Sequence, residues 1–144
     1  MGPPEYTLEA VNEIVPKLAQ IVGRQLERRA RIEQLLLALG ERLGEVPERV
    51  EPDPADPPDV RQLKRDIAER VAVYQSAWHE LDEIGAVLKD PRIGLVDFYG
   101  RVNGKLVWLC WRYGEDEVRH YHELDQGFSA RKPIATDVRR HQLN

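Results

Sequence analysis

IGLVDFYGRVNGKLVWLCWRYGEDEVRHYHELDQGFSARKP, residues 93–133, is the stretch that decides the fold of this chain. It contains the only cysteine, two of the four histidines and seven of the ten aromatic residues. The Asn103-Gly104 dipeptide lies between two segments of alternating apolar residues, which is typical of a two-residue type I′ hairpin turn. We therefore predict a small three-stranded antiparallel β-meander over residues 93–124.

The hairpin turn also predicts which side chains share a face. A two-residue loop places Val102 opposite Lys105 and Asp97 opposite Cys110, because side chains alternate along a strand. One face is then apolar and expected to pack on helices: Val96, Phe98, Val107, Leu109 and Trp111. The other face is polar and aromatic: Asp97, Tyr99, Trp108, Cys110 and Arg112.

The register of the third strand stays open at the level of sequence. His120 and His122 share one face of this strand, together with Val118 and Leu124. A three-residue loop over residues 114–116 would place both histidines beside Cys110. A loop of two or four residues would place them with Trp111 in the core, since a slip of one residue reverses the face.

The ninety residues before this stretch predict two helices. Apolar residues at helical spacing indicate a first helix over residues 7–40, capped by Thr7 and kinked ahead of Pro16. Five prolines among acidic residues indicate a solvated linker over residues 45–58. A second helix is expected over residues 59–88, where Asp59 and Gln62 match a capping box. The fold class is therefore α+β: a long antiparallel helical hairpin, packed as a coiled coil with a kinked first helix, followed by the meander.

Length and composition limit the function classes. The 144 residues fit one domain, expected over residues 5–133, with a flexible tail over residues 134–144. A net charge of −4 argues against nonspecific nucleic-acid binding, because binding to phosphates requires a basic surface. A single cysteine cannot form an internal disulfide, and no apolar run reaches about 20 residues. We do not expect residues 1–6 to act as a signal peptide, because they lack a basic region and an apolar core, and we expect a cytoplasmic protein without membrane association. The narrow apolar stripe of the helical hairpin predicts a homodimer.

Several motifs resemble those of the bacterial and archaeal family called domain of unknown function 2203. They are YTLEA (6–10) with Asn12 and Pro16, GLVDFYG (94–100), CWRYGE (110–115), YHELDQGF (121–128) and RKP (131–133). The resemblance implies a ligand or structural site at the motif positions Asp97, Cys110, Arg112, Glu115, His122 and Arg131. This chain departs from the pattern at Tyr99, where many relatives carry proline, and at Tyr121, where they often carry tryptophan. The family name implies no activity.

The residues themselves suggest a metal site as the sharpest chemical hypothesis. His120, His122 and Cys110, with a carboxylate from Asp97 or Glu115, are a borderline-soft ligand set suited to zinc or iron. The competing interpretation is a packed cysteine and a histidine that donates to a carbonyl or carboxylate. This structural interpretation is the commoner outcome for isolated His and Cys.

Two catalytic alternatives and an internal ion pair also stay open. Cys110 could act as a nucleophile with a histidine base, although catalytic cysteines usually lie in positively charged surroundings or at helix N-termini. Asp97 or Glu115 beside Arg112 could perform acid–base catalysis or form an ion pair that fixes the sheet. We predict a noncatalytic cytoplasmic binding or interaction module with an unspecified small-molecule or protein partner, the alternative being a zinc- or iron-dependent protein or enzyme.

Overall fold

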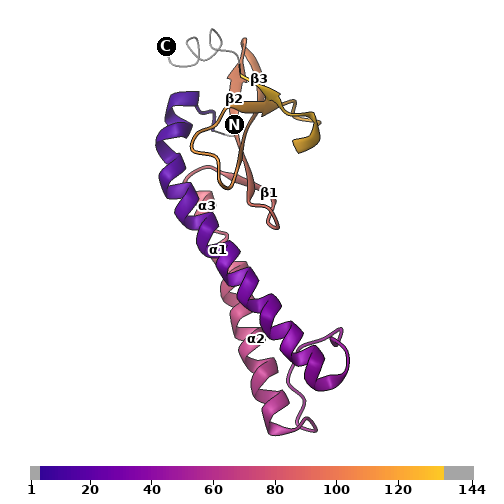
Figure 1. The fold of residues 1–144 in the computed structure, drawn as a ribbon. Coiled ribbons are helices and arrows are strands. Elements are labelled where there is room, and N and C mark those ends of the chain that lie inside the picture. Colours follow the sequence, from indigo (N-terminus) through magenta and orange to yellow (C-terminus); the bar gives the residue numbers. More distant parts are fainter. Residues whose placement is uncertain (1–3, 135–144) are drawn as a thin grey trace. The chain divides into compact units, whose positions relative to one another are not determined.

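The computed structural model describes residues 4–134 and has the α+β architecture expected from the sequence. The elements in chain order are α1 (Leu8–Leu43), α2 (Pro58–Ala77), α3 (Glu80–Glu83), β1 (Val87–Asp90), β2 (Leu95–Val102), β3 (Lys105–Arg112), β4 (His120–His122), the 3-10 turn η1 (Phe128–Ala130) and β5 (Lys132–Pro133) (Figure 1). The described chain divides into two compact units. One unit comprises residues 4–23 and 80–134, and the other comprises residues 24–79.

The first unit is built on an antiparallel sheet with the strand order β1-β2-β3-β4-β5. The β2–β3 hairpin has the predicted register, with Val102 opposite Lys105 and Asp97 opposite Cys110. Its turn has φ 52° at Asn103 and φ 78° at Gly104, and positive φ at both central residues is what a type I′ turn requires. The predicted division into an apolar and a polar face is therefore confirmed for these two strands.

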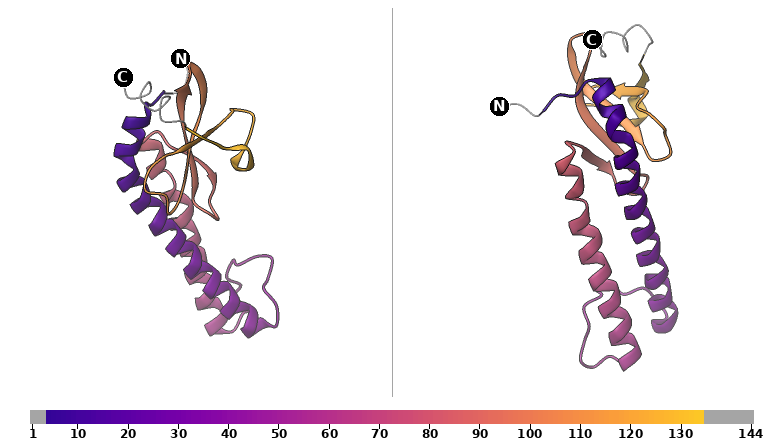
Figure 2. Two further views of the ribbon diagram at one scale, coloured as in Figure 1. Left: turned by 45° about the horizontal axis from the view of Figure 1, so that its top comes forward. Right: turned by 90° about the vertical axis from the view of Figure 1, so that its left-hand side faces the viewer.

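The N-terminal residues support this sheet (Figure 2). Thr7 caps α1 through a 3.1 Å hydrogen bond from the Ala10 amide, as predicted. Asn12 Oδ1, in the second turn of α1, accepts the Val118 amide at 2.7 Å. Tyr6 meets the ring of Phe98 edge-on at 5.6 Å, and both Phe98 and Trp111 are fully buried. The first turns of α1 thus hold the sheet and the loop that precedes β4.

The second unit is a helical hairpin of the remaining part of α1 and α2. Leu35, Leu39, Val60 and Ile67 form its buried core, and Gln25 Nε2 donates to the Tyr74 carbonyl at 2.7 Å. Within this unit, the first residues of the α1 segment therefore contact the last turn of α2, so the two helices are antiparallel. Asp56, in the proline-rich connection, forms an ion pair with the buried Lys64 of α2, with Oδ2 and Nζ 2.8 Å apart.

Three details of the predicted second helix and sheet are wrong. The second helix ends at Ala77 rather than at residue 88, and the residues after it form α3 and β1. The sheet has five strands instead of three, because β1 and β5 extend the meander at both edges. Asp59 does not cap α2: Pro57 is the N-cap residue without a side-chain bond, and Asp59 pairs with Arg42 at 2.8 Å. Proline at the first helical position explains the start of α2 without a capping box.

The helix α1 continues through Pro16 to Leu43, beyond the expected end at residue 40. Of the expected tail, residues 135–144 lie outside the described residues, while Ile134 is buried and its amide donates to Arg119 O at 2.8 Å. Within residues 4–134, no helix combines the length and apolarity needed to cross a membrane.

Candidate metal centre

The register between β3 and β4 answers the question that the sequence left open. His120 lies opposite Cys110, and His122 lies opposite Trp108. Both histidines therefore share the face of Cys110, but residues 113–119 separate the two strands, so the three-residue loop considered for this arrangement is wrong. Val118 is nevertheless buried, because it precedes β4 and its amide is held by Asn12.

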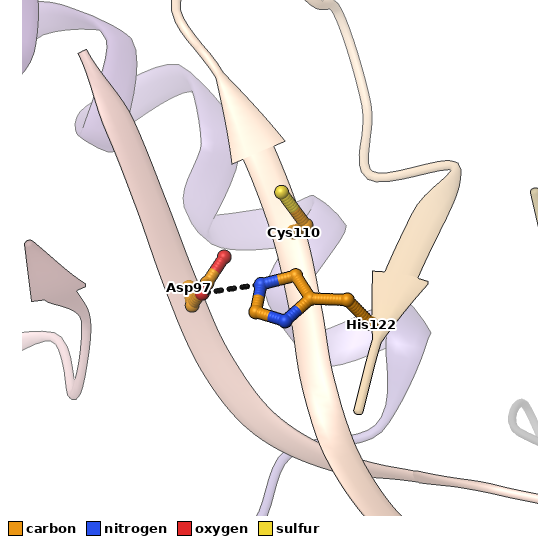
Figure 3. Close-up of side chains that lie close together, drawn as sticks. All are labelled: Asp97, Cys110 and His122. Atoms are coloured by element: carbon orange, nitrogen blue, oxygen red, sulfur yellow. Dashed lines mark hydrogen bonds and ion pairs between the residues drawn. The ribbon is translucent and has the colours of Figure 1, made fainter. Parts of the chain in front are cut away.

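Three potential ligands converge on this face. Asp97 comes from β2, Cys110 from the neighbouring β3 and His122 from β4, and one ligand atom from each lies within 4.8 Å of the other two. Figure 3 shows the imidazole of His122 reaching across β3 toward Asp97, beside the thiol of Cys110. All three residues are buried, with exposed fractions of 0%, 0% and 2% in chain order.

The hydrogen bonds of His122 fix its ring. Nε2 lies 2.7 Å from Asp97 Oδ2, and Nδ1 lies 3.0 Å from the carbonyl oxygen of Glu123. A carbonyl oxygen can only accept a hydrogen bond, so Nδ1 carries a proton and donates a hydrogen bond to the carbonyl of Glu123. The nitrogen facing Asp97 is then either protonated, giving an imidazolium, or free to accept a proton or bind a cation.

Burial controls the protonation of the other two groups. Desolvation raises the pKa of Asp97 above its ordinary value, although the neighbouring His122 acts in the opposite direction. Desolvation, followed by the charge of Asp97, raises the pKa of the Cys110 thiol to about 12. Among the described residues, Asp97 Oδ1 has no hydrogen-bond partner. Asp97 Oδ1 is therefore an unsatisfied acceptor in a fully buried location.

A second polar cluster adjoins the first. Arg131 binds both carboxylate oxygens of Glu115, with Nη1–Oε1 at 3.2 Å and Nη2–Oε2 at 3.1 Å. Its Nη1 also lies 3.9 Å from Cys110 Sγ. The guanidinium stacks on Phe128, with its carbon 4.5 Å from the ring centre. Arg131 thus connects the 3-10 turn η1, Glu115 and the buried thiol.

The structure places the remaining predicted residues at the margin of the centre. His120 is not among the three convergent ligands, and its Nδ1 lies 3.8 Å from Glu115 Oε2. Burial and the nearby Arg131 lower the pKa of His120. Arg112 is exposed, and its guanidinium lies 5.7 Å from the ring centre of Phe128. The guanidinium that binds Glu115 belongs to Arg131.

Sequence reasoning missed two contributors to this region. Phe128 supplies the surface on which Arg131 stacks, and Asn12 holds the segment before β4 from a position 106 residues earlier in the chain. The motifs that include both residues were the only available signal, and they gave no partner for either. Long-range contacts of this kind depend on the fold and leave no local periodicity.

These features define an α+β protein with a buried Asp–Cys–His centre on an antiparallel sheet. The chain belongs to the family described as Uncharacterized conserved protein (DUF2203), whose model matches residues 5–134. This match supports the family resemblance of the sequence motifs. Comparisons with curated proteins and with solved structures gave no match.

Proposed function

We propose that this protein is a noncatalytic binding module whose ligand is a divalent transition-metal ion, zinc or iron, held by Asp97, Cys110 and His122. The observation that carries the proposal is the convergence of three different ligand atoms within 4.8 Å in a fully buried location. Carboxylate, thiolate and imidazole are each established ligands of zinc and iron. Three protein ligands leave one position of a tetrahedral ion for another group.

The ring orientation of His122 supports this assignment. Metal-ligating histidines usually donate their second ring N–H to a carbonyl or carboxylate, which fixes the tautomer and the ring plane. His122 Nδ1 has this arrangement with the carbonyl of Glu123 at 3.0 Å. Nε2 is thereby oriented toward Asp97 and the centre.

The buried carboxylate of Asp97 is a further support. A carboxylate is costly to bury unless a cation or hydrogen-bond donors compensate it. Asp97 is completely buried, and its Oδ1 has no partner among the described residues. A metal ion at this position would satisfy that oxygen and replace the proton now shared between Asp97 and His122.

Two other functions are weaker. The 2.7 Å contact between His122 and Asp97 favours a structural hydrogen bond in a binding module without metal. A catalytic thiolate is opposed by the raised pKa of Cys110 and by its burial, since reactive cysteines have lowered pKa values and partial exposure.

Metal analysis of the full-length chain tests the proposal. The protein is purified from medium supplemented with zinc and iron, and its metal content is measured by mass spectrometry. Metal-free protein is then titrated with Co²⁺, whose absorption reports thiolate coordination. We expect one metal ion per chain, and we expect Asp97→Asn, Cys110→Ser and His122→Ala each to lose it.

His120→Ala is the matched control, because it removes the same side chain two residues away on the same strand. It should retain stoichiometric metal. Wild-type protein that neither contains metal nor binds Co²⁺ would refute the proposal. A loss in His120→Ala as complete as in His122→Ala would refute the three-residue ligand set and favour His120, His122 and Cys110.

A further inference from the structure

Arg131 is held in a fixed position beside the sulfur of the proposed centre. Its side chain makes two hydrogen bonds to Glu115 and stacks on Phe128, and it is only 18% exposed. One of its donors, Nη1, lies 3.9 Å from Cys110 Sγ, within the range of a hydrogen bond to sulfur. Nη1 also donates to Glu115 Oε1 at 3.2 Å, and because this nitrogen carries two N–H groups, its second one remains for the sulfur.

The chemistry of a guanidinium limits what Arg131 can do there. It remains protonated and has no lone pair for a metal, so it acts only as a hydrogen-bond donor. A thiolate that binds a metal still has lone pairs that accept such donors. Groups that donate to a ligand atom orient it and tune the metal that it holds.

Glu115 supplies the rigidity that this role requires. Its Oε1 accepts the backbone amide of Arg112 at 2.7 Å, and its carbonyl accepts Trp111 Nε1 at 2.9 Å. The carboxylate is therefore fixed to the end of β3 by contacts that do not involve Arg131. A fixed carboxylate that binds a guanidinium with two parallel bonds also fixes its direction.

We infer that Arg131 is a positioning residue that donates a hydrogen bond to the Cys110 sulfur in the metal-bound protein, and that Glu115 acts through Arg131. The inference rests on the proposed metal function. It assigns a role outside the ligand set to the Arg131–Glu115 pair, which would otherwise serve only to attach η1 and β5 to the sheet.

Co²⁺ titration of full-length variants separates these roles. In Arg131→Met we expect Co²⁺ affinity to fall by roughly 10–100-fold, the usual effect of losing a group that supports a metal ligand. The sulfur-to-cobalt charge-transfer band should move to lower energy, because a thiolate without the donor gives up electrons more readily. If Arg131 and Glu115 formed only a structural ion pair, removing Arg131 would not shift this band.

Glu115→Gln and Arg131→Lys complete the test. Glu115→Gln should shift the band in the same direction, and the double variant should lose no more affinity than Arg131→Met alone, since the two residues act in series. Arg131→Lys keeps a charged donor and should restore part of the band position. If Arg131→Met does not fold, as judged by circular dichroism, Glu115→Gln and Arg131→Lys still report on the band.

Arg119→Met is the matched control. Arg119 is a more exposed arginine in the same region, paired with Glu117 at 2.9 Å, and its loss should leave the band and the affinity unchanged. A wild-type band that is the same in Arg131→Met and Glu115→Gln would overturn the inference while leaving metal binding intact. Absence of the band in wild-type protein would overturn the metal function itself.

Discussion

The thiol of Cys110 offers the most quantitative test of the buried centre. Its pKa is raised from 9.0 to about 12, first by burial and then by the negative charge of Asp97. Only the thiolate reacts with alkylating reagents. The metal-free, folded protein should therefore react far more slowly with iodoacetamide than the same chain in urea.

The expected difference follows from the shift. Three pKa units correspond to about a 1,000-fold smaller thiolate fraction at pH 8, before the steric effect of burial is added. The same shift has a consequence for stability, because the folded state keeps the thiol proton more tightly than the unfolded state. This contribution, on the order of 4 kcal/mol, is complete below pH 9 and is lost as the pH rises toward 12.

Alkylation is followed by mass spectrometry of the intact protein after metal removal, with and without urea. Asp97→Asn serves as the comparison, because removing the negative charge should lower the thiol pKa and accelerate alkylation of the folded protein while leaving the rate in urea unchanged. A folded wild-type protein that is alkylated within about 10-fold of its rate in urea would contradict the reasoning, because the ionisation difference alone predicts more.

Two further predictions concern the hairpin turn and the oligomeric state. Gly104→Ala should lower the free energy of unfolding, measured in urea, by roughly 1–2 kcal/mol, because a residue with a side chain is strained at the φ of 78° found there. No atom lies within 4 Å of the added Cβ, so neither a contact nor a clash would alter this effect, and an unchanged unfolding midpoint would contradict the prediction. The homodimer stays a prediction, supported by the exposed apolar side chains of Leu37 and Val73 on the helical hairpin. Light scattering after size-exclusion chromatography should give twice the chain mass of 16.6 kDa, and a monomer across the accessible concentration range would reject it.

The β2–β3 hairpin could be predicted residue by residue because its determinants are local. Asn103 and Gly104 accept positive φ, which selects the turn, and the alternation of side chains then fixes every pair from Val102–Lys105 to Leu95–Arg112. The pairing of Asp97 with Cys110 follows from this count alone. This part of the candidate site therefore required no knowledge of the tertiary structure.

The strand β1 could not be separated from the preceding helix by its pattern. Leu88 continues the apolar spacing of α2, so the periodicity predicted a helix to residue 88. The helix already ends at Ala77, and after the short α3 the chain turns toward β1 at Gly85, where φ is 72°. An isolated glycine is a weak stop signal, since many helices tolerate one.

The position of the third strand depends on individual side-chain contacts, one local and one distant in sequence. The loop after β3 is closed by the side chain of Glu115 on the Arg112 amide, and the segment before β4 is held by Asn12. Neither contact has a periodic signature, so the sequence allowed two opposite placements of His122. The pairing of Glu115 with the guanidinium of Arg131 rather than Arg112 has no periodic signature either, because it depends on where the fold places residue 131.

The unit that carries the Asp–Cys–His centre is assembled from two segments that are far apart in the sequence, residues 4–23 and 80–134. During synthesis on the ribosome, the N-terminal helix turns emerge long before the strands that they support. The hydrogen bond from the Val118 amide to Asn12 can form only after Val118 has been translated, 106 codons after Asn12. The centre can consequently form only after the helical hairpin has been translated, and a nascent chain interrupted after this hairpin would carry none of the three ligands.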